Sequence, residues 1–228
     1  MFDALPTAKR HWVYSMFFLE IPKSASSSLH NLLGERNLLK KHKGLIHNKF
    51  SSHPLFKGHF DTRHATPEMI RSVFSNQVNE FFSFAVIRSP IDRLASSYSF
   101  GKENRLWKLY DLPENISADS YIDWLYKSKK EKRQDILILL PQTTWTHSSI
   151  FRPTEVLRFE NLQENWKSLL KKYDIKGLSE TIPHLNASKR VKEQIFSKES
   201  LSKIREIYRT DYELLYHDAE LSSPPKKN

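Results

Sequence analysis

Apolar residues in this chain occur first in short continuous runs and then at helical spacing. The runs at 12–21 and 81–87 are almost wholly apolar, which is typical of parallel strands buried on both faces. A shorter run at 155–159 has the same character. After each run, apolar residues recur three or four positions apart, as on one side of a helix. The pattern predicts an α/β fold with a central, mainly parallel sheet flanked by helices.

The pattern is weaker elsewhere along the chain. Residues 37–52 are basic and contain Gly44, so we expect a loop there, followed by a short strand at 55–60. Thr66 is expected to cap a helix that begins at Pro67. Further helices are expected at 120–126, 136–140 and 198–216. We expect residues 1–221 to form a single domain, and the basic tail at 222–228 to be disordered.

The first apolar run ends at Pro22, and Lys23 and five small residues follow it. Such a strand–turn–helix sequence leaves several backbone N–H groups facing one point, and this point attracts phosphate or sulfate. It is not a Walker A motif, because both glycines are absent and the lysine precedes the small residues. Taken alone, the turn is also compatible with helix-capping serines. Hydroxyl groups that add donors here are those of Ser24, Ser26, Ser27 and Ser28.

A second polar turn follows the run at 81–87. Arg88 stands at the strand end, and arginine binds phosphate through two parallel hydrogen bonds. The alternative is that it pairs with surface carboxylates. Ser89 is expected to cap the next helix, with Pro90 first and Asp92 completing a capping box. Because ligands of parallel sheets bind beyond the carboxyl ends of the strands, the two turns together predict a nucleotide with two separated anionic groups.

These two segments resemble the nucleotide-binding motifs of sulfotransferases. Residues 21–29 are similar to the 5′-phosphosulfate loop, and residues 86–98 are similar to the 3′-phosphate motif. Their spacing and the closing pattern at 201–216 resemble the Golgi-type carbohydrate sulfotransferases, the group of the heparan sulfate 2-O- and chondroitin sulfotransferases. The resemblance extends over residues 13–217. It departs from the family at Ala25, which replaces a glycine and requires an ordinary φ there, and at Ser89, which replaces Asp or Asn.

The resemblance implies a P-loop-like three-layer fold and a donor, 3′-phosphoadenosine 5′-phosphosulfate, which leaves as adenosine 3′,5′-bisphosphate. Lys23 is expected to hold the phosphosulfate and to stabilise the charge that develops on the bridging oxygen. Arg88 and Ser96 would hold the 3′-phosphate. No metal is expected, because a sulfuryl group carries less charge than a phosphoryl group. The donor-binding residues implied by the resemblance are Lys23, Ser24, Ala25, Ser26, Ser27, Ser28, Arg88, Ser96, Ser188 and Lys189.

The acceptor hydroxyl needs a general base. His59, in a Gly-His pair, resembles the catalytic histidine of the uronyl 2-O-sulfotransferases, and His64 is the second choice for the base or for an acceptor contact. Some sulfotransferases use a glutamate, and Glu20 adjoins the first turn. Gln142, in a Pro-Gln pair, is expected to touch the acceptor, most simply a saccharide. Ser188 lies in a late basic loop that resembles the segment closing over the nucleotide.

Composition narrows the alternatives without selecting one. The chain has 36 Lys and Arg against 26 Asp and Glu, a net charge of +10 that suits an anionic partner. It has no cysteine and no apolar run long enough to span a bilayer, so we expect a cytoplasmic enzyme with no transmembrane segment. We favour a sulfotransferase that binds no nucleic acid. The competing interpretations are a P-loop nucleotide kinase and a non-catalytic binder of nucleic acid or another anionic polymer.

Overall fold

The computed structural model describes residues 15–56, 62–183 and 195–217 of the chain. Its contacts divide the chain into two compact units. The first comprises residues 1–88 and 144–187, and the second comprises residues 89–143 and 188–228. The first unit carries the sheet, and the described part of the second is built from helices. Within the described residues, no helix is both long and apolar enough to cross a bilayer.

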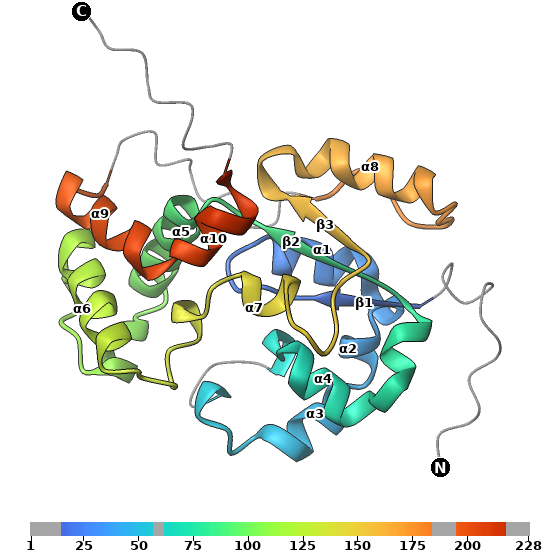
Figure 1. Ribbon diagram of the computed structural model, residues 1–228, viewed down its shortest axis with the longest axis horizontal. Helices are drawn as coiled ribbons and strands as arrows, with labels where there is room; N and C mark the ends of the chain where they lie inside the picture. The colour runs from blue at the N-terminus through green and yellow to red at the C-terminus, as the bar shows by residue number, and fades with distance from the viewer. Residues whose placement is uncertain (1–14, 57–61, 184–194, 218–228) are drawn as a thin grey trace, which may run out of the picture. The chain divides into compact units, whose positions relative to one another are not determined.

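Three parallel strands form the sheet of the first unit, in the order β1-β2-β3 (Figure 1). They are β1 (Met16–Leu19), β2 (Phe82–Ile87) and β3 (Glu155–Arg158). The three predicted strands and the parallel sheet are therefore confirmed. In the register, Ile87 pairs with Arg158, so the residues that follow β2 and β3 emerge together at the carboxyl edge of the sheet.

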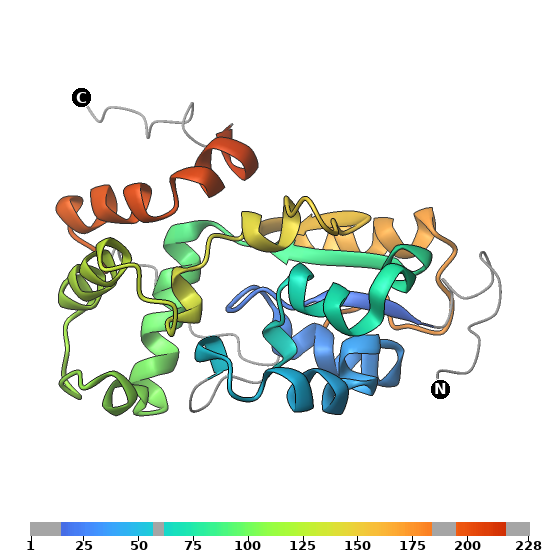
Figure 2. The ribbon, with the colours of Figure 1, turned by 60° about the horizontal axis from the view of Figure 1, so that its bottom comes forward.

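Helices cover both faces of this sheet. On one face, Phe18 and Phe84 belong to a buried cluster with Leu29 of α1 (Ser26–Leu33) and Trp166 of α8 (Leu162–Lys172). On the other face, the ring of Phe17 packs edge-on against three further phenylalanines, Phe74, Phe81 and Phe151. Phe74 ends α4 (Pro67–Phe74), which lies along the sheet (Figure 2). This confirms the expected layered α/β fold, in which each face is sealed by burial of large apolar side chains.

The predicted loop at 37–52 is wrong, since α2 (Leu38–Lys41) and α3 (Lys43–Phe50) occupy most of it. Asn37 supplies the N-cap, because its side chain accepts a hydrogen bond from the amide of Leu39 at 3.1 Å. Ile46 is buried and anchors α3, so a single buried side chain outweighs the low helix propensity of Gly44.

The predicted strand at 55–60 is also wrong where the structure describes it. Residues Pro54–Phe56 form a 3₁₀ turn, η3, and residues 57–60 lie outside the described part of the chain. A proline that opens the segment fixes φ and removes a donor from any sheet ladder. The remaining 3₁₀ turns of this unit are η2 (Gly34–Arg36), η4 (Thr62–His64), η5 (Ser75–Glu80) and η8 (Phe159–Asn161).

The second unit packs its described helices around Trp107, Ile122, Leu125 and Ile204. Its longer helices are α5 (Pro90–Glu103), α6 (Ala118–Lys130), α9 (Lys198–Ile207) and α10 (Arg209–Leu215), and its 3₁₀ turns are η6 (Leu106–Tyr110) and η7 (Leu137–Leu139). The short helix α7 (Thr143–Thr146) spans the boundary between the units.

Three local predictions in the second unit need correction. In place of the helix expected at 136–140, Leu137–Leu139 form only the 3₁₀ turn η7. The single helix expected at 198–216 is broken at Tyr208, whose buried hydroxyl donates to the carbonyl of Ile138 at 2.6 Å. The break at Tyr208 coincides with this anchor. The capping box is absent, because no side-chain hydrogen bond from Ser89 caps α5. Pro90 still begins the helix as predicted, since its fixed φ suits that position.

Candidate active site

The turn after β1 is built from residues in the left-handed region of backbone conformation. Lys23 has a φ of 66° and Ala25 a φ of 62°, with the buried Ser24 between them. Alternating left-handed residues of this kind turn successive N–H groups toward one concavity, which binds anions. The expectation of an ordinary φ at Ala25 is therefore wrong. The closure of the turn outweighs the cost, about 1–2 kcal/mol, of placing a Cβ in this conformation.

Hydrogen bonds within the turn stabilise the same segment. The amide of Ser24 and the hydroxyl of Ser26 both donate to the carbonyl of Ile21, at 3.3 and 2.9 Å. The hydroxyl of Ser26 therefore donates its hydrogen within the turn, and we call this hydrogen bond the internal brace. Ser26 is also one of the residues predicted to bind the donor. Ser28 is also buried, whereas Ser27 is exposed.

The helix that follows this turn presents its N-terminus without a side-chain cap. Ala25 is the N-cap of α1, and it makes no side-chain cap hydrogen bond. The first N–H groups of a helix have no partners within the helix, and the helix dipole makes this end attractive to anions. A left-handed turn and an uncapped helix of eight residues therefore converge on one point beyond β1.

The turn after β2 reaches toward the turn after β1. An Nη1 hydrogen of Arg88 points to the carbonyl oxygen of Lys23 at 3.4 Å. The Cζ atom of Arg88 lies over the ring of Phe159, 4.2 Å from its centroid. The structure thus brings together Lys23 and Arg88, two cationic residues that are 65 positions apart in the sequence. Phe159 was not singled out from the sequence, although the run at 155–159 ends there.

Glu20, three residues before Lys23, contacts His64 through its main-chain carbonyl. The Glu20 carboxylate is fully buried, and its Oε1 lies 2.7 Å from Nδ1 of His30 and 3.2 Å from Nδ2 of Asn37. This engagement in the interior argues against Glu20 as the base. Its main-chain oxygen lies 2.6 Å from Nδ1 of His64. Because a carbonyl only accepts, this contact places a hydrogen on Nδ1 of His64.

The other predicted site residues lie outside the described residues or in the second unit. His59, Ser188 and Lys189 lie outside the described residues. Ser96, on α5, and Gln142 belong to the second unit. Gln142 is fully buried, and both its amide nitrogens, main-chain and Nε2, donate to Oδ2 of Asp211 at 2.9 and 3.4 Å. Its contact with an acceptor stays a prediction, and its observed contacts stabilise the second unit.

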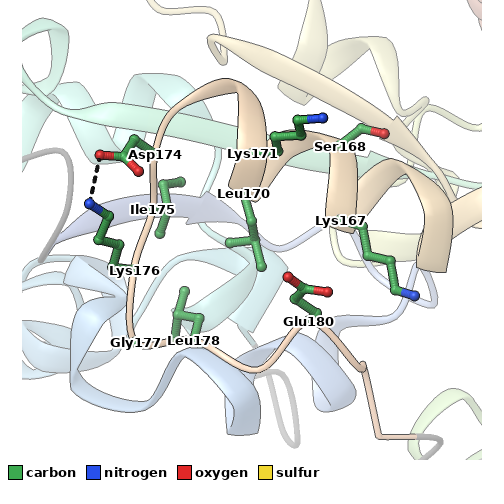
Figure 3. A pocket seen from close by; sticks show the side chains of 10 residues that line it. All are labelled: Lys167, Ser168, Leu170, Lys171, Asp174, Ile175, Lys176, Gly177, Leu178 and Glu180. Carbon is green, nitrogen blue, oxygen red and sulfur yellow. Dashed lines mark ion pairs between the residues drawn. The ribbon is translucent and has the colours of Figure 1, made fainter.

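No group of three or more carboxylate or imidazole side chains is gathered for a metal ion among the residues that the structure describes. A pocket of about 550 Å³ lies in the first unit between the end of α8 and the loop at 174–180 (Figure 3). Lys176 and Asp174 form an ion pair of 3.2 Å on its wall. None of the residues that line it comes from either turn. The candidate site is therefore the carboxyl edge of the sheet, not this pocket.

A family model described as "Sulfotransferase family" matches residues 8–217 and includes both turns. No curated protein and no solved structure matches the sequence significantly.

Proposed function

We propose, since the chain belongs to the sulfotransferase family, that its donor is 3′-phosphoadenosine 5′-phosphosulfate and its acceptor a saccharide hydroxyl. The proposal for the donor is supported by the contact between Arg88 and the carbonyl of Lys23. This contact brings the two proposed anion-binding turns next to each other at one edge of the sheet. A ligand that uses both turns needs two anionic groups separated by a linker. A nucleoside that bears a 5′-phosphosulfate and a 3′-phosphate meets this requirement.

The residues present fit such a donor. The left-handed backbone at Lys23 and Ala25 and the uncapped N-terminus of α1 supply amides for the 5′-phosphosulfate. Arg88 supplies a planar fork of donors for the 3′-phosphate. The family resemblance assigns further donor contacts to Ser96, Ser188 and Lys189.

Lys23 has the chemical role. When the sulfuryl group moves to the acceptor, negative charge grows on the oxygen that stays with the nucleotide. An ammonium group placed beside that oxygen stabilises the transition state more than the ground state, so it accelerates the reaction. The S–O bond to the nucleotide breaks as the bond to the acceptor oxygen forms, and no electrons enter or leave.

A general base must remove the proton of the acceptor hydroxyl. We assign the base to His59 on the family resemblance, and we assign acceptor contact to His64, five residues later on η4. The Glu20 carbonyl holds the Nδ1 hydrogen of His64 at 2.6 Å and so fixes the orientation of this ring. Separate substitution of each histidine therefore tests which of the two acts as the base.

The test is sulfate transfer from labelled donor to a panel of acceptors, with mass analysis of the product. The panel contains neutral and acidic oligosaccharides, a tyrosine peptide and a simple alcohol. We expect a sulfated saccharide, with loss of transfer in Lys23→Ala and His59→Ala and partial loss in His64→Ala. Full activity in any one variant removes that residue from the mechanism. Sulfation of the peptide or the alcohol alone overturns the saccharide assignment.

A further inference from the structure

We infer that Phe159 is a positioning residue, whose ring holds the guanidinium of Arg88 in place to receive the 3′-phosphate of the donor. The inference rests on the proposed function, because it takes the ligand to be a 3′-phosphorylated nucleotide. Phe159 itself touches Arg88 and is assigned no contact with the reacting atoms.

The sheet register places the two residues side by side. Ile87 at the end of β2 pairs with Arg158 at the end of β3, so Arg88 and Phe159 are the next residues on neighbouring parallel strands. The Cζ atom of Arg88 lies 4.2 Å from the centroid of the Phe159 ring. This distance is well within the roughly 6 Å at which a cation is attracted to the face of an aromatic ring.

The ring is a fixed support. Phe159 is half-buried and packs against the core cluster between the sheet and α8. Its main-chain carbonyl accepts the amide hydrogen of Leu162, where α8 begins. Both its side chain and its backbone are therefore held by neighbours that do not depend on a ligand. A flexible arginine that rests on such a ring is ordered before the phosphate arrives.

This contact leaves the arginine able to bind phosphate. The five N–H donors of a guanidinium lie in its plane, and a cation–π contact uses none of them. One donor already points toward the Lys23 carbonyl at 3.4 Å, so the group is oriented toward the first turn. Ordering a side chain in advance reduces the entropy that binding would otherwise cost. The effect therefore falls on affinity for a 3′-phosphate.

The experiment is a calorimetric titration with two ligands, adenosine 3′,5′-bisphosphate and adenosine 5′-monophosphate. Phe159→Leu removes the ring and keeps an apolar side chain. We expect its affinity for the bisphosphate to fall about fivefold, from the usual strength of a partly desolvated cation–π contact, while its affinity for the monophosphate stays the same. Phe159→Trp restores a ring and is expected to restore bisphosphate affinity.

Two controls separate this role from simple packing. In an Arg88→Met background, Phe159→Leu is expected to cause no further loss, because the cation that it positions is gone. Tyr173→Leu removes another ring that contacts a cation, with Lys172 Nζ 5.1 Å from its centroid, but beyond the end of α8. That variant is expected to bind the bisphosphate as the wild type does. Thermal melting shows which variants fold, and Phe159→Met is the alternative if Phe159→Leu does not.

The outcomes distinguish the inference from the proposed function. If the wild-type protein does not bind the bisphosphate, the proposed function fails and the inference falls with it. If the wild type binds but Phe159→Leu and Phe159→Met bind equally well, only the inference fails. It also fails if both ligands lose affinity equally, which would mean that the ring contacts the nucleoside, or if Phe159→Trp does not restore binding.

Discussion

The two turns at the carboxyl edge of the sheet, which we propose as anion-binding turns, are built by different means. The turn after β1 relies on its backbone, with Lys23 and Ala25 at positive φ and an uncapped helix behind them. The turn after β2 relies on one side chain, that of Arg88, and has no residue at positive φ before α5, which begins at Pro90 and also lacks a side-chain cap. A site built from backbone is sensitive to conformation, whereas a site built from a side chain is sensitive to charge and to whatever orients that side chain.

This difference predicts that substitutions in the two turns will have different signatures. Changes in the first turn that keep Lys23 are expected to alter stability and loop order. Changes in the second turn are expected to alter affinity for the 3′-phosphate alone. Lys23 is the exception within the first turn, because its side chain is proposed to stabilise the negative charge on the oxygen of the bond that breaks.

The largest expected effect is that of Lys23→Ala. Loss of a group that stabilises developing charge lowers kcat by about 10²–10³-fold. Affinity for adenosine 3′,5′-bisphosphate is expected to fall less, because the amides of the turn remain. Initial rates and calorimetry measure the two quantities, with Lys41→Ala on the exposed side of α2 as the control. A kcat within threefold of the wild type would contradict the assigned role.

Arg88→Met is expected to come next. A charge-assisted phosphate contact contributes about 1.5–3 kcal/mol, so affinity for the bisphosphate should fall about 10–100-fold. Affinity for adenosine 5′-monophosphate should not change, because that ligand has no 3′-phosphate. Arg205→Met, at an exposed position on α9, is the matched control. Equal loss for the two nucleotides would show that Arg88 supports the fold and does not read the 3′-phosphate.

Ser26→Ala tests the internal brace. It removes the hydroxyl that donates to the Ile21 carbonyl at 2.9 Å, at an expected cost of about 1 kcal/mol in the free energy of unfolding. The donor KM should rise a few-fold while kcat is retained, because the turn loosens and the lysine stays. Urea unfolding and initial rates measure these effects, and the exposed Ser27 provides the comparison through Ser27→Ala. Identical behaviour of the two variants would argue against the brace.

The smallest expected effect has the opposite sign. At Ala25, with φ at 62°, glycine relieves a strain of about 1–2 kcal/mol but costs about 0.5–1 kcal/mol through the more flexible unfolded chain. Ala25→Gly should therefore raise Tm by about 1–3 °C. Ala95→Gly makes the same change inside α5 and should lower Tm. If both variants lower Tm, the strain at Ala25 is not real.

Much of the fold could be predicted from the sequence because it rests on local pattern. Continuous apolar runs predicted the three strands, and Pro67 and Pro90 predicted where two helices begin. The helices at 38–50 were missed because the burial of Ile46 depends on the assembled unit. The break at Tyr208 was missed for a similar reason, since its hydroxyl bonds a carbonyl 70 residues away.

Part of the candidate site was likewise predictable from local sequence, and part depended on the assembled fold. Lys23 and Arg88 were predictable because each follows a strand, and parallel strands end at one edge. The positive φ of Ala25 was not, because the residue type favours the right-handed region and only the closure of the turn overrides it. Phe159 needed the register between β2 and β3, which no local pattern specifies.

The central claim is that the two turns form one site for a nucleotide with two separated anionic groups. Its most direct test is a titration of the wild-type protein with adenosine 3′,5′-bisphosphate and with adenosine 5′-monophosphate under the same conditions. We predict one binding site and at least about tenfold tighter binding of the bisphosphate, since its 3′-phosphate adds the proposed contact with Arg88. Equal affinity for the two nucleotides, or no binding of either, would contradict it.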